Sequence, residues 1–306
     1  MSDHKEPDVT SLEAHHRLDG GLKTLTAPRG LLSGTSFAIR GVWERRELLG
    51  LLVQRELSAR YKNSSLGFLW SLLRPLAMLL IYYVAVGKFL SAERSIPQFA
   101  IFIFCGLTVW TLFSEIIGGT TSSIVGNAGL IKKVYLPREI FPLAAVGSAL
   151  FNFGVQFAVL LAATLVVGSP PHLEALWYVP SGVILVTSFA FGIGLLLAAI
   201  NVYLRDVQHL VEIILLVLFW ASPIVYSYQL VHQILQGNWI EQIFLSNPVT
   251  IVVLMFQRSM WVAGSDQVFP EDLEIRALIA FAVSLVLIWV AQRVFARLEG
   301  NFAQEL

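Results

Sequence analysis

Six apolar runs that carry few charges set the pattern of this chain. A bilayer core about 30 Å thick is crossed by roughly 20 helical residues at about 1.5 Å each, so apolar runs of this length predict membrane-spanning helices. The pattern therefore predicts an all-α membrane protein with six spans between about residues 66 and 294. The expected spans are Leu66 to Leu90, Phe99 to Ile124, Ile140 to Val167, Leu176 to Tyr203, Val211 to Tyr226 and Leu278 to Val294.

Two segments outside these runs have a different character. Residues 1–40 are polar and lack the apolar core of a cleavable signal peptide, so we expect a flexible cytoplasmic tail ahead of a transmembrane domain at 41–306. The segment from Tyr228 to Glu274 is too apolar for a plain loop, and Pro248 and Gly264 interrupt it too often for a span.

The stretch before the first span, Val42 to Lys62, is amphipathic. Apolar residues such as Leu49, Leu52 and Val53 repeat at helical spacing, and charged residues occupy another face. This pattern is typical of a helix that lies in the membrane interface. From the residues alone, the helix is either a membrane anchor or a docking surface.

The charges balance in number but differ in placement. The chain has 21 Lys and Arg and 21 Asp and Glu residues, so no net basic field favours a nucleic-acid partner. Because positive charge is retained on the cytoplasmic side, cations near alternate span ends predict that both termini are cytoplasmic. The expected cytoplasmic cations are Arg45, Arg46, Arg55, Arg60, Lys62, Lys132, Lys133, Arg138, Arg205, Arg293 and Arg297, against Lys88, Arg94, Arg258 and Arg276 on the other side.

Enzyme signatures are missing from the sequence. No His-Glu-x-x-His spacing and no G-x-x-x-x-G-K-[ST] loop occurs, and the nearest Gly-Lys pair, Gly87-Lys88, is followed by Phe89. The single Cys105 allows neither an intramolecular disulfide nor a cysteine-based metal site. A membrane-bound transferase would need a His or acidic pair that we do not find. We expect no catalytic residue, metal or cofactor on this chain.

Glu115 is the only charge in the second expected span, where a charge costs roughly 2.5 to 3.5 kcal/mol. It needs a partner, and Arg74 in the first span is a candidate. A structural contact within the bundle is one interpretation, and proton coupling is the other. A secondary transporter driven by an ion gradient would show several intramembrane charges and internal repeats, and neither pattern is found.

The loop between the second and third expected spans, Gly126 to Leu143, carries a pattern of its own. Its apolar residues share one helical face, its two lysines lie on another, and Pro137 ends the turn. The pattern predicts a short helix at the inner membrane surface, which a transporter driven by a separate soluble subunit needs; an ordinary positively charged loop is the alternative. The apolar face consists of Leu130, Ile131, Val134 and Tyr135, and the lysines are Lys132 and Lys133.

Five segments, in order and with sensible spacing, resemble the membrane subunit of polysaccharide-exporting ATP-binding-cassette transporters. The resemblance covers about Trp43 to Leu306. That family exports O-antigen, teichoic acid and capsule precursors, so the resemblance implies a permease that moves a lipid-linked polysaccharide across the bacterial inner membrane. The segments are Tyr61 to Leu76, Ser123 to Leu143, Asn201 to Val211, Ser222 to Ser227 and Asn247 to Thr250.

The resemblance also implies an assembly. Two copies of this chain would form a homodimer around a channel, bound to two copies of a separate ATPase that holds ATP and Mg. A permease of the same family that exports a small lipid or a drug is the alternative, besides a gradient-driven transporter that works alone.

Roles for single positions follow from the resemblance. Residues in the 126–143 loop would form the coupling helix to the ATPase, and the 42–62 stretch would be the interface helix. Arg205 and Asp206 would form a second cytoplasmic turn, and the segment from Tyr228 to Glu274 would hold two re-entrant outer gate helices. The coupling residues are Asn127, Ala128, Gly129, Leu130, Ile131, Lys132, Lys133 and Tyr135, and the interface residues are Glu47, Arg55, Glu56 and Arg60.

Aromatic side chains are the candidates for lining a sugar channel, because aromatic faces stack on the C–H surfaces of sugars without fixing one register. At span ends, the same residues also serve as belts at the membrane interface. The candidate lining residues are Tyr82, Tyr83, Trp110, Phe113, Trp220, Tyr226 and Tyr228.

Overall fold

The computed structural model describes residues 40–61, 69–134 and 136–306, and no β-strand occurs within these ranges. The expected all-α fold is confirmed for this part of the chain. The expected tail up to residue 39, together with Lys62 and Tyr135, lies outside the described residues.

Twelve α-helices in the described ranges position the site. The first span is α4 continued by a π-helical segment, η2 at Tyr83–Phe89. The α-helices are α3 (Arg46–Tyr61), α4 (Leu69–Tyr82), α5 (Phe99–Gly126), α6 (Ala128–Ile131), α7 (Ile140–Val166), α8 (Tyr178–Tyr203), α9 (Val207–Trp220), α10 (Tyr228–Leu235), α11 (Trp239–Ser246), α12 (Pro248–Met260), α13 (Leu273–Leu298) and α14 (Phe302–Glu305).

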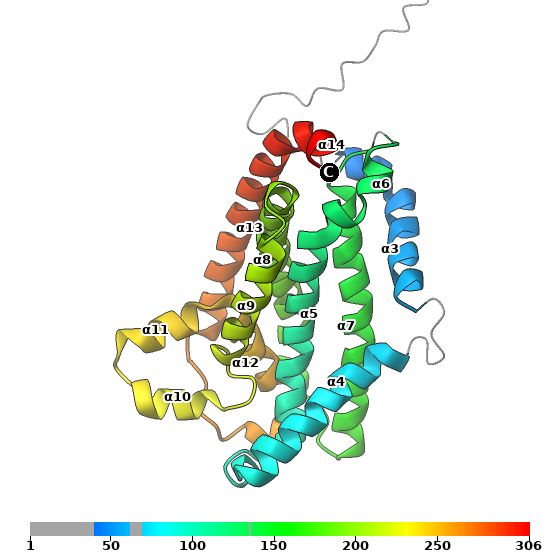
Figure 1. The fold of residues 1–306 in the computed structure, drawn as a ribbon. Helices are drawn as coiled ribbons and strands as arrows, with labels where there is room; N and C mark the ends of the chain where they lie inside the picture. Colours follow the sequence, from blue (N-terminus) through cyan, green and yellow to red (C-terminus); the bar gives the residue numbers. More distant parts are fainter. Residues whose placement is uncertain (1–39, 62–68, 135) are drawn as a thin grey trace, which may run out of the picture.

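The long helices α5, α7, α8 and α13 run side by side along one axis (Figure 1). The helix α6 and the C-terminus lie at one end of this bundle, which we call the α6 end. The helix α10 lies toward the opposite end, which we call the α10 end. Helix α3 packs lengthwise on α7 near the α6 end, where Leu52 is buried.

Five helical segments among the described residues are long and apolar enough to cross a membrane, or six if the bent pair α11–α12 counts as one span. The expected second, third and fourth spans agree with α5, α7 and α8 to within about two residues at each end. The expected sixth span is wrong in its limits, because α13 extends from Leu273 to Leu298 and is longer at both ends.

The expected fifth span, Val211 to Tyr226, is also wrong in its limits. The helix α9 ends at Trp220 after 14 residues, which is about 21 Å of helix and less than the bilayer core. The chain then turns at Ser222 and Pro223, which are held by α12: Gln257 donates to the Pro223 carbonyl at 2.9 Å, and Asn247 donates to the Ser222 hydroxyl at 3.3 Å.

The break at Pro248 within the mixed segment is present as expected. Asn247 caps the new helix by accepting from the Val249 N–H at 3.0 Å, and Pro248 stands at the first helical position, where its missing N–H is no loss. The axes of α11 and α12 differ by 79°. The sequence pattern did not indicate that α12 would be core, yet every residue from Val249 to Gln257 is buried.

Helix α5 forms the centre of the bundle. It buries 18 of its 28 residues and packs on α7, α8 and α12. Small residues allow the close approach: a Cβ on Gly194 of α8 would stand 2.8 Å from the Thr120 Cβ of α5. A second cluster joins α3, α6, α7, α8 and α13 to α14 at the α6 end, with Ile131, Phe295 and Phe302 buried in it.

Gly194→Val is expected to destabilise the bundle by about 1 to 3 kcal/mol, because the added side chain overlaps Thr120 and forces α5 and α8 apart. Thermal unfolding of the purified protein in detergent measures the loss. The matched control is Gly154→Val on α7, where an added Cβ meets nothing within 4 Å. Equal melting temperatures for the two variants would contradict the close packing of α5 on α8.

Candidate functional site

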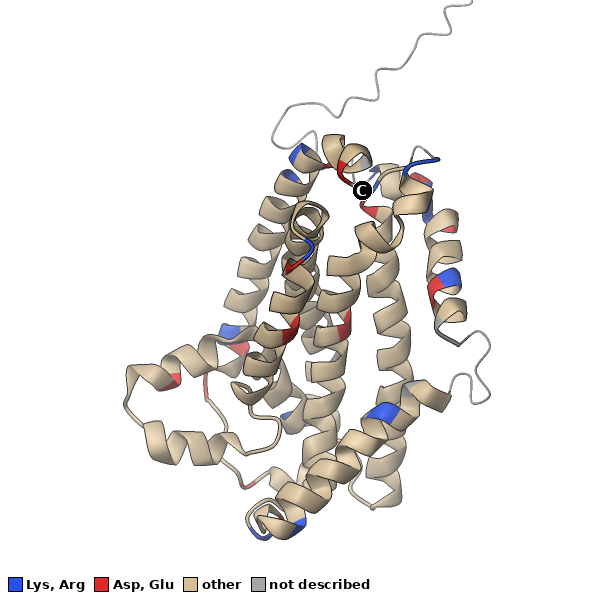
Figure 2. Cartoon of the chain, viewed as in Figure 1, with Lys and Arg blue, Asp and Glu red and all other residues tan. Residues whose placement is uncertain are grey.

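The α6 end carries most of the charge. Lys and Arg gather there on α3, on the loop after α6 and on the last turns of α13, while α5, α7 and α8 are almost free of charge along their length (Figure 2). The cations that were expected on one side of the membrane therefore gather at one end of the molecule.

Arg55 and Asn127, predicted as functional residues from different segments, are brought together at the α6 end. The Arg55 guanidinium on α3 donates to the Asn127 side-chain oxygen between α5 and α6. The Asn127 amide nitrogen in turn donates to the Ser123 carbonyl of α5 at 2.8 Å. Asn127 thus ties the expected interface helix and the expected coupling helix to the end of α5.

Helix α6 is a single turn with one buried side. Ile131 is buried and Leu130 packs on the same cluster, as the spacing predicted. Val134 departs from the prediction, because it lies beyond the helix and is 45% exposed. Gly129, Lys132 and Lys133 are exposed, so α6 presents a small positively charged surface outward.

Other predicted residues lie on α3 and in the turn after α8. Glu47 is exposed on α3, Arg60 falls in the last turn of α3, and Arg205 and Asp206 are exposed in the turn after α8. Glu56 on α3 is partly buried. We therefore define the docking face as α6 with the 132–134 loop and the exposed side of α3.

The segment between α6 and α7 contacts the C-terminal helix α14. The Arg138 guanidinium lies 5.5 Å from the centre of the Phe302 ring, and the Tyr203 hydroxyl donates to the Leu298 carbonyl at 3.0 Å. Burial raises the pKa of the neighbouring Glu139 carboxyl, against the opposite effect of Arg138. Arg138 thus contacts α14, and a separate hydrogen bond joins the end of α8 to the end of α13.

A groove of about 930 Å³ lies between α4, α5, α7 and α9. One of its sides is aromatic: Tyr82 stacks on Phe219 with ring centres 5.6 Å apart, and Trp110 meets Phe219 edge-on at 5.3 Å. Three of the predicted lining residues, Tyr82, Trp110 and Trp220, line this groove.

The other four aromatic candidates do not line the groove. Phe113 is fully buried and stacks on Phe189 in the core. Tyr83 faces the Lys88 ammonium group, Tyr226 donates to the Trp220 carbonyl at 2.6 Å, and Tyr228 is buried in a polar network described below.

Polar residues of α4, α5, α7 and α9 also line the groove. Glu115 accepts a hydrogen bond from the Asn152 amide of α7 at 2.8 Å, so the expected structural contact is present with Asn152 as donor; Arg74 lines the same groove. Sequence reasoning missed Asn152, Gln156 and Glu212, which also line it. The available signal was the four-residue spacing of Ser148, Asn152 and Gln156 within an otherwise apolar run.

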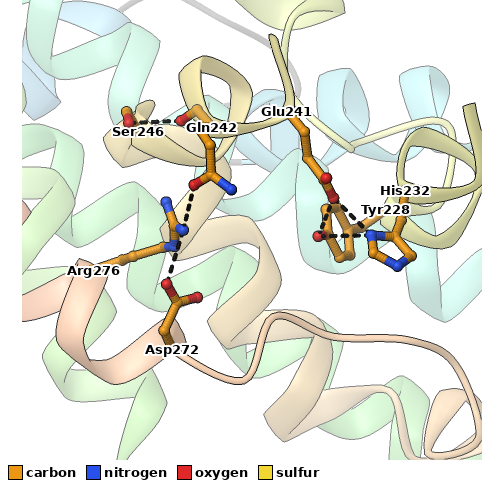
Figure 3. A network of polar contacts seen from close by, with 7 residues as sticks. All are labelled: Tyr228, His232, Glu241, Gln242, Ser246, Asp272 and Arg276. Carbon is orange, nitrogen blue, oxygen red and sulfur yellow. Dashed lines mark hydrogen bonds and ion pairs between the residues drawn. The ribbon is translucent and has the colours of Figure 1, made fainter. Parts of the chain in front are cut away.

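The helices α10 and α11 are fastened to each other and to α13 by a polar network (Figure 3). Glu241 accepts from the Tyr228 hydroxyl at 2.7 Å and lies 2.7 Å from His232 Nδ1, so one buried carboxylate joins α10 to α11. Arg276 of α13 donates to the Gln242 side chain at 2.7 Å and pairs with Asp272 at 2.8 Å, which lowers the pKa of Asp272.

Within the described ranges, no three His, Cys, Asp or Glu side chains gather to hold a metal ion. The features that stand out are the docking face, the two-sided groove and the fastened α10–α11 pair.

A comparison with protein families shows the family to which this chain is related. Residues 47–261 match the family described as ABC-2 type transporter. The chain belongs to the ABC-2 transporter family. The matched part of this ABC-2 transporter chain runs from α3 to the residue after α12, so it includes the docking face, the groove and the α10–α11 pair.

Curated relatives share most of their length with this ABC-2 transporter chain. The O-antigen export system permease protein RfbA of Myxococcus xanthus is 32% identical over 269 residues, which cover 88% of this chain and 98% of the relative. RfbA of Klebsiella pneumoniae is 27% identical over 85% of this chain and 95% of the relative. The polysialic acid transport protein KpsM of Escherichia coli is 26% identical over 66% and 76%.

Glu241→Ala is expected to loosen the α10–α11 pair of this ABC-2 transporter, because the Tyr228 hydroxyl and His232 lose their acceptor. Loss of a buried hydrogen-bonded partner costs about 1 to 3 kcal/mol, so amide hydrogen exchange in α10 should accelerate by at least fivefold. Hydrogen exchange read by mass spectrometry makes the measurement. Glu271→Ala, an exposed carboxylate before α13, is the control; unchanged exchange in both variants would show that the network does not hold α10.

Proposed function

We propose that this chain is the permease subunit of an ATP-driven exporter that moves a lipid-linked, O-antigen-like polysaccharide across the bacterial inner membrane. The observation that carries the proposal is the match over nearly the whole chain to the O-antigen export permease of M. xanthus. The two-sided groove supports a sugar substrate, since aromatic rings and hydrogen-bonding groups together suit a sugar's C–H faces and hydroxyls.

The force for export comes from a separate ATPase in this proposal. ATP and Mg are bound there, and two copies of the ATPase meet two copies of this chain. The docking face receives the ATPase, with α6 as coupling helix and α3 as interface helix. The Arg55–Asn127 contact and the Arg138–Phe302 contact support this assignment, because they connect the residues on either side of α6 to α3 and α14.

The α6 end faces the cytoplasm in this proposal. The excess of Lys and Arg at that end supports the orientation, because cations near span ends are retained on the cytoplasmic side. The first described helical residues and the C-terminus both lie at that end, which agrees with the proposed cytoplasmic termini.

A homodimer completes the channel. Helices α4 and α9 flank the groove and expose many large apolar residues, among them Leu73, Ile81, Ile213 and Val217. A second copy packed against these helices would close the groove into a passage. The helices α10 and α11 then act as re-entrant outer gate helices at the far end, which agrees with α9 being too short to cross the bilayer alone.

Deletion of the gene tests the function. The expected result is loss of surface polysaccharide and accumulation of lipid-linked polysaccharide inside the cell, with restoration by the wild-type chain. A surface polysaccharide that persists in the deletion strain, together with loss of export of a drug or a small lipid, would favour the alternative substrate class.

Gly129→Trp is expected to abolish export and to reduce co-purification of the ATPase by at least tenfold. An added Cβ at Gly129 meets nothing within 4 Å, so the indole would project from α6 into the ATPase without disturbing the fold. Tagged pull-down and surface polysaccharide staining measure the two effects.

Gly300→Trp is the matched control for this variant. It adds the same side chain at the same end of the bundle, at an exposed glycine whose Cβ also meets nothing within 4 Å. Normal ATPase binding by the Gly129→Trp protein would place the coupling contact elsewhere.

A further inference from the structure

Helix α7 carries a row of three buried polar side chains, two of which, Asn152 and Gln156, line the groove. Ser148, Asn152 and Gln156 follow each other at intervals of four residues, so they share one side of the helix, and all three are at most 3% exposed. They face the seam with α5, where Gly119 approaches Ala145 closely. Polar side chains in a membrane are expensive to bury and mark substrate or ion pathways.

Two hydroxyl groups on α5, those of Thr111 and Ser122, bond within their own helix. Thr111 donates to the Leu107 carbonyl at 2.8 Å and Ser122 to the Gly118 carbonyl at 2.9 Å. These two hydroxyl groups therefore do not need a ligand as hydrogen-bond acceptor. Hydroxyls that bond back to the preceding turn are common in helices and need no functional explanation.

Gln156 differs from these residues. It is 2% exposed, it lines the groove, and its amide oxygen has no hydrogen-bond partner among the described residues. An unsatisfied amide oxygen in an apolar bundle is unfavourable unless a donor reaches it. Asn152, one turn earlier on α7, lines the same groove. It donates to Glu115 of α5, which also lines the groove.

We propose that Glu115, Asn152 and Gln156 form a track that hydrogen-bonds the hydroxyl groups of the passing sugar chain and so selects among polymers. Sugar hydroxyls both donate and accept, which matches side-chain amides and a carboxylate. Trp110 and Tyr82, on the aromatic side of the groove, stack on the C–H faces of the same sugars. Each side chain can release one sugar hydroxyl and bond to the next, so the polymer can slide through the groove without being held at one position.

This inference rests on the proposed export function, so the experiment separates the two. In the deletion strain, the wild-type chain must restore surface polysaccharide; failure of the wild type would refute the proposed function itself. With export restored, Gln156→Leu is expected to lower surface polysaccharide at least fivefold at equal membrane abundance and equal ATPase co-purification. Gln156→Asn should recover part of the loss, because it keeps an amide.

The matched control is Ala158→Leu, which adds the same side chain at an exposed position of α7 outside the groove, and it should export normally. Export by Gln156→Leu equal to that of the control, with an unchanged preference between the native polymer and one of different sugar composition, would overturn the track.

A labelling experiment avoids dependence on export by the variant. In a Cys105→Ala background, Gln156→Cys should react with a charged, water-soluble methanethiosulfonate reagent in permeabilised cells that make no polymer. Reaction should be at least fivefold slower when the polymer is being made, and Ala158→Cys should not react in either state. Absence of labelling at position 156 in both states would show that this position is closed to water between α5 and α7. That result would also overturn the track.

Discussion

Close packing of α5 against α7, α8 and α12 is the contact on which the other elements depend. Lipid tails are as apolar as the helix surfaces, so helices in a membrane associate through tight packing and hydrogen bonds, with small residues at the contacts. Gly106, Gly119 and Gly194 supply such contacts around α5. With α5 fixed in this way, its remaining side becomes the floor of the groove, and its last turn carries Asn127 and α6.

The extent of the long helices could be predicted from the sequence, because a bilayer core demands a nearly fixed length of apolar residues. The expected extent of α9 was wrong because its apolar pattern continues past the point where the helix stops, although Pro223 was a local signal, since proline disfavours a helical residue before it. The contacts that hold the turn there could not be predicted, because Asn247 and Gln257 lie 25 and 34 residues beyond Ser222 and Pro223. The burial of α12 is likewise a property of its neighbours and has no mark in a segment of mixed composition.

In the candidate site, too, some features follow from the local sequence and others from contacts between distant residues. Local pattern indicated the residues of α6 and the amphipathic side of α3, but the Arg55–Asn127 contact joins positions 72 residues apart. Aromatic type alone did not separate Trp110, which lines the groove, from Phe113, which is fully buried three residues later. The side of a helix that faces a groove depends on what packs around it, and for a span that is apolar on all sides the sequence holds little trace of that choice.

The anchoring of the 222–223 turn on α12 has a mechanical consequence for the α10 end of the molecule. The segment that contains α10 and α11 leaves from this turn and returns at Asn247, and both points are held at α12 by Gln257 and by the Asn247 side chain. The Arg276–Gln242 contact adds a third attachment, to α13. A displacement of α10 and α11 that leaves α12 in place therefore has to break a contact with α13.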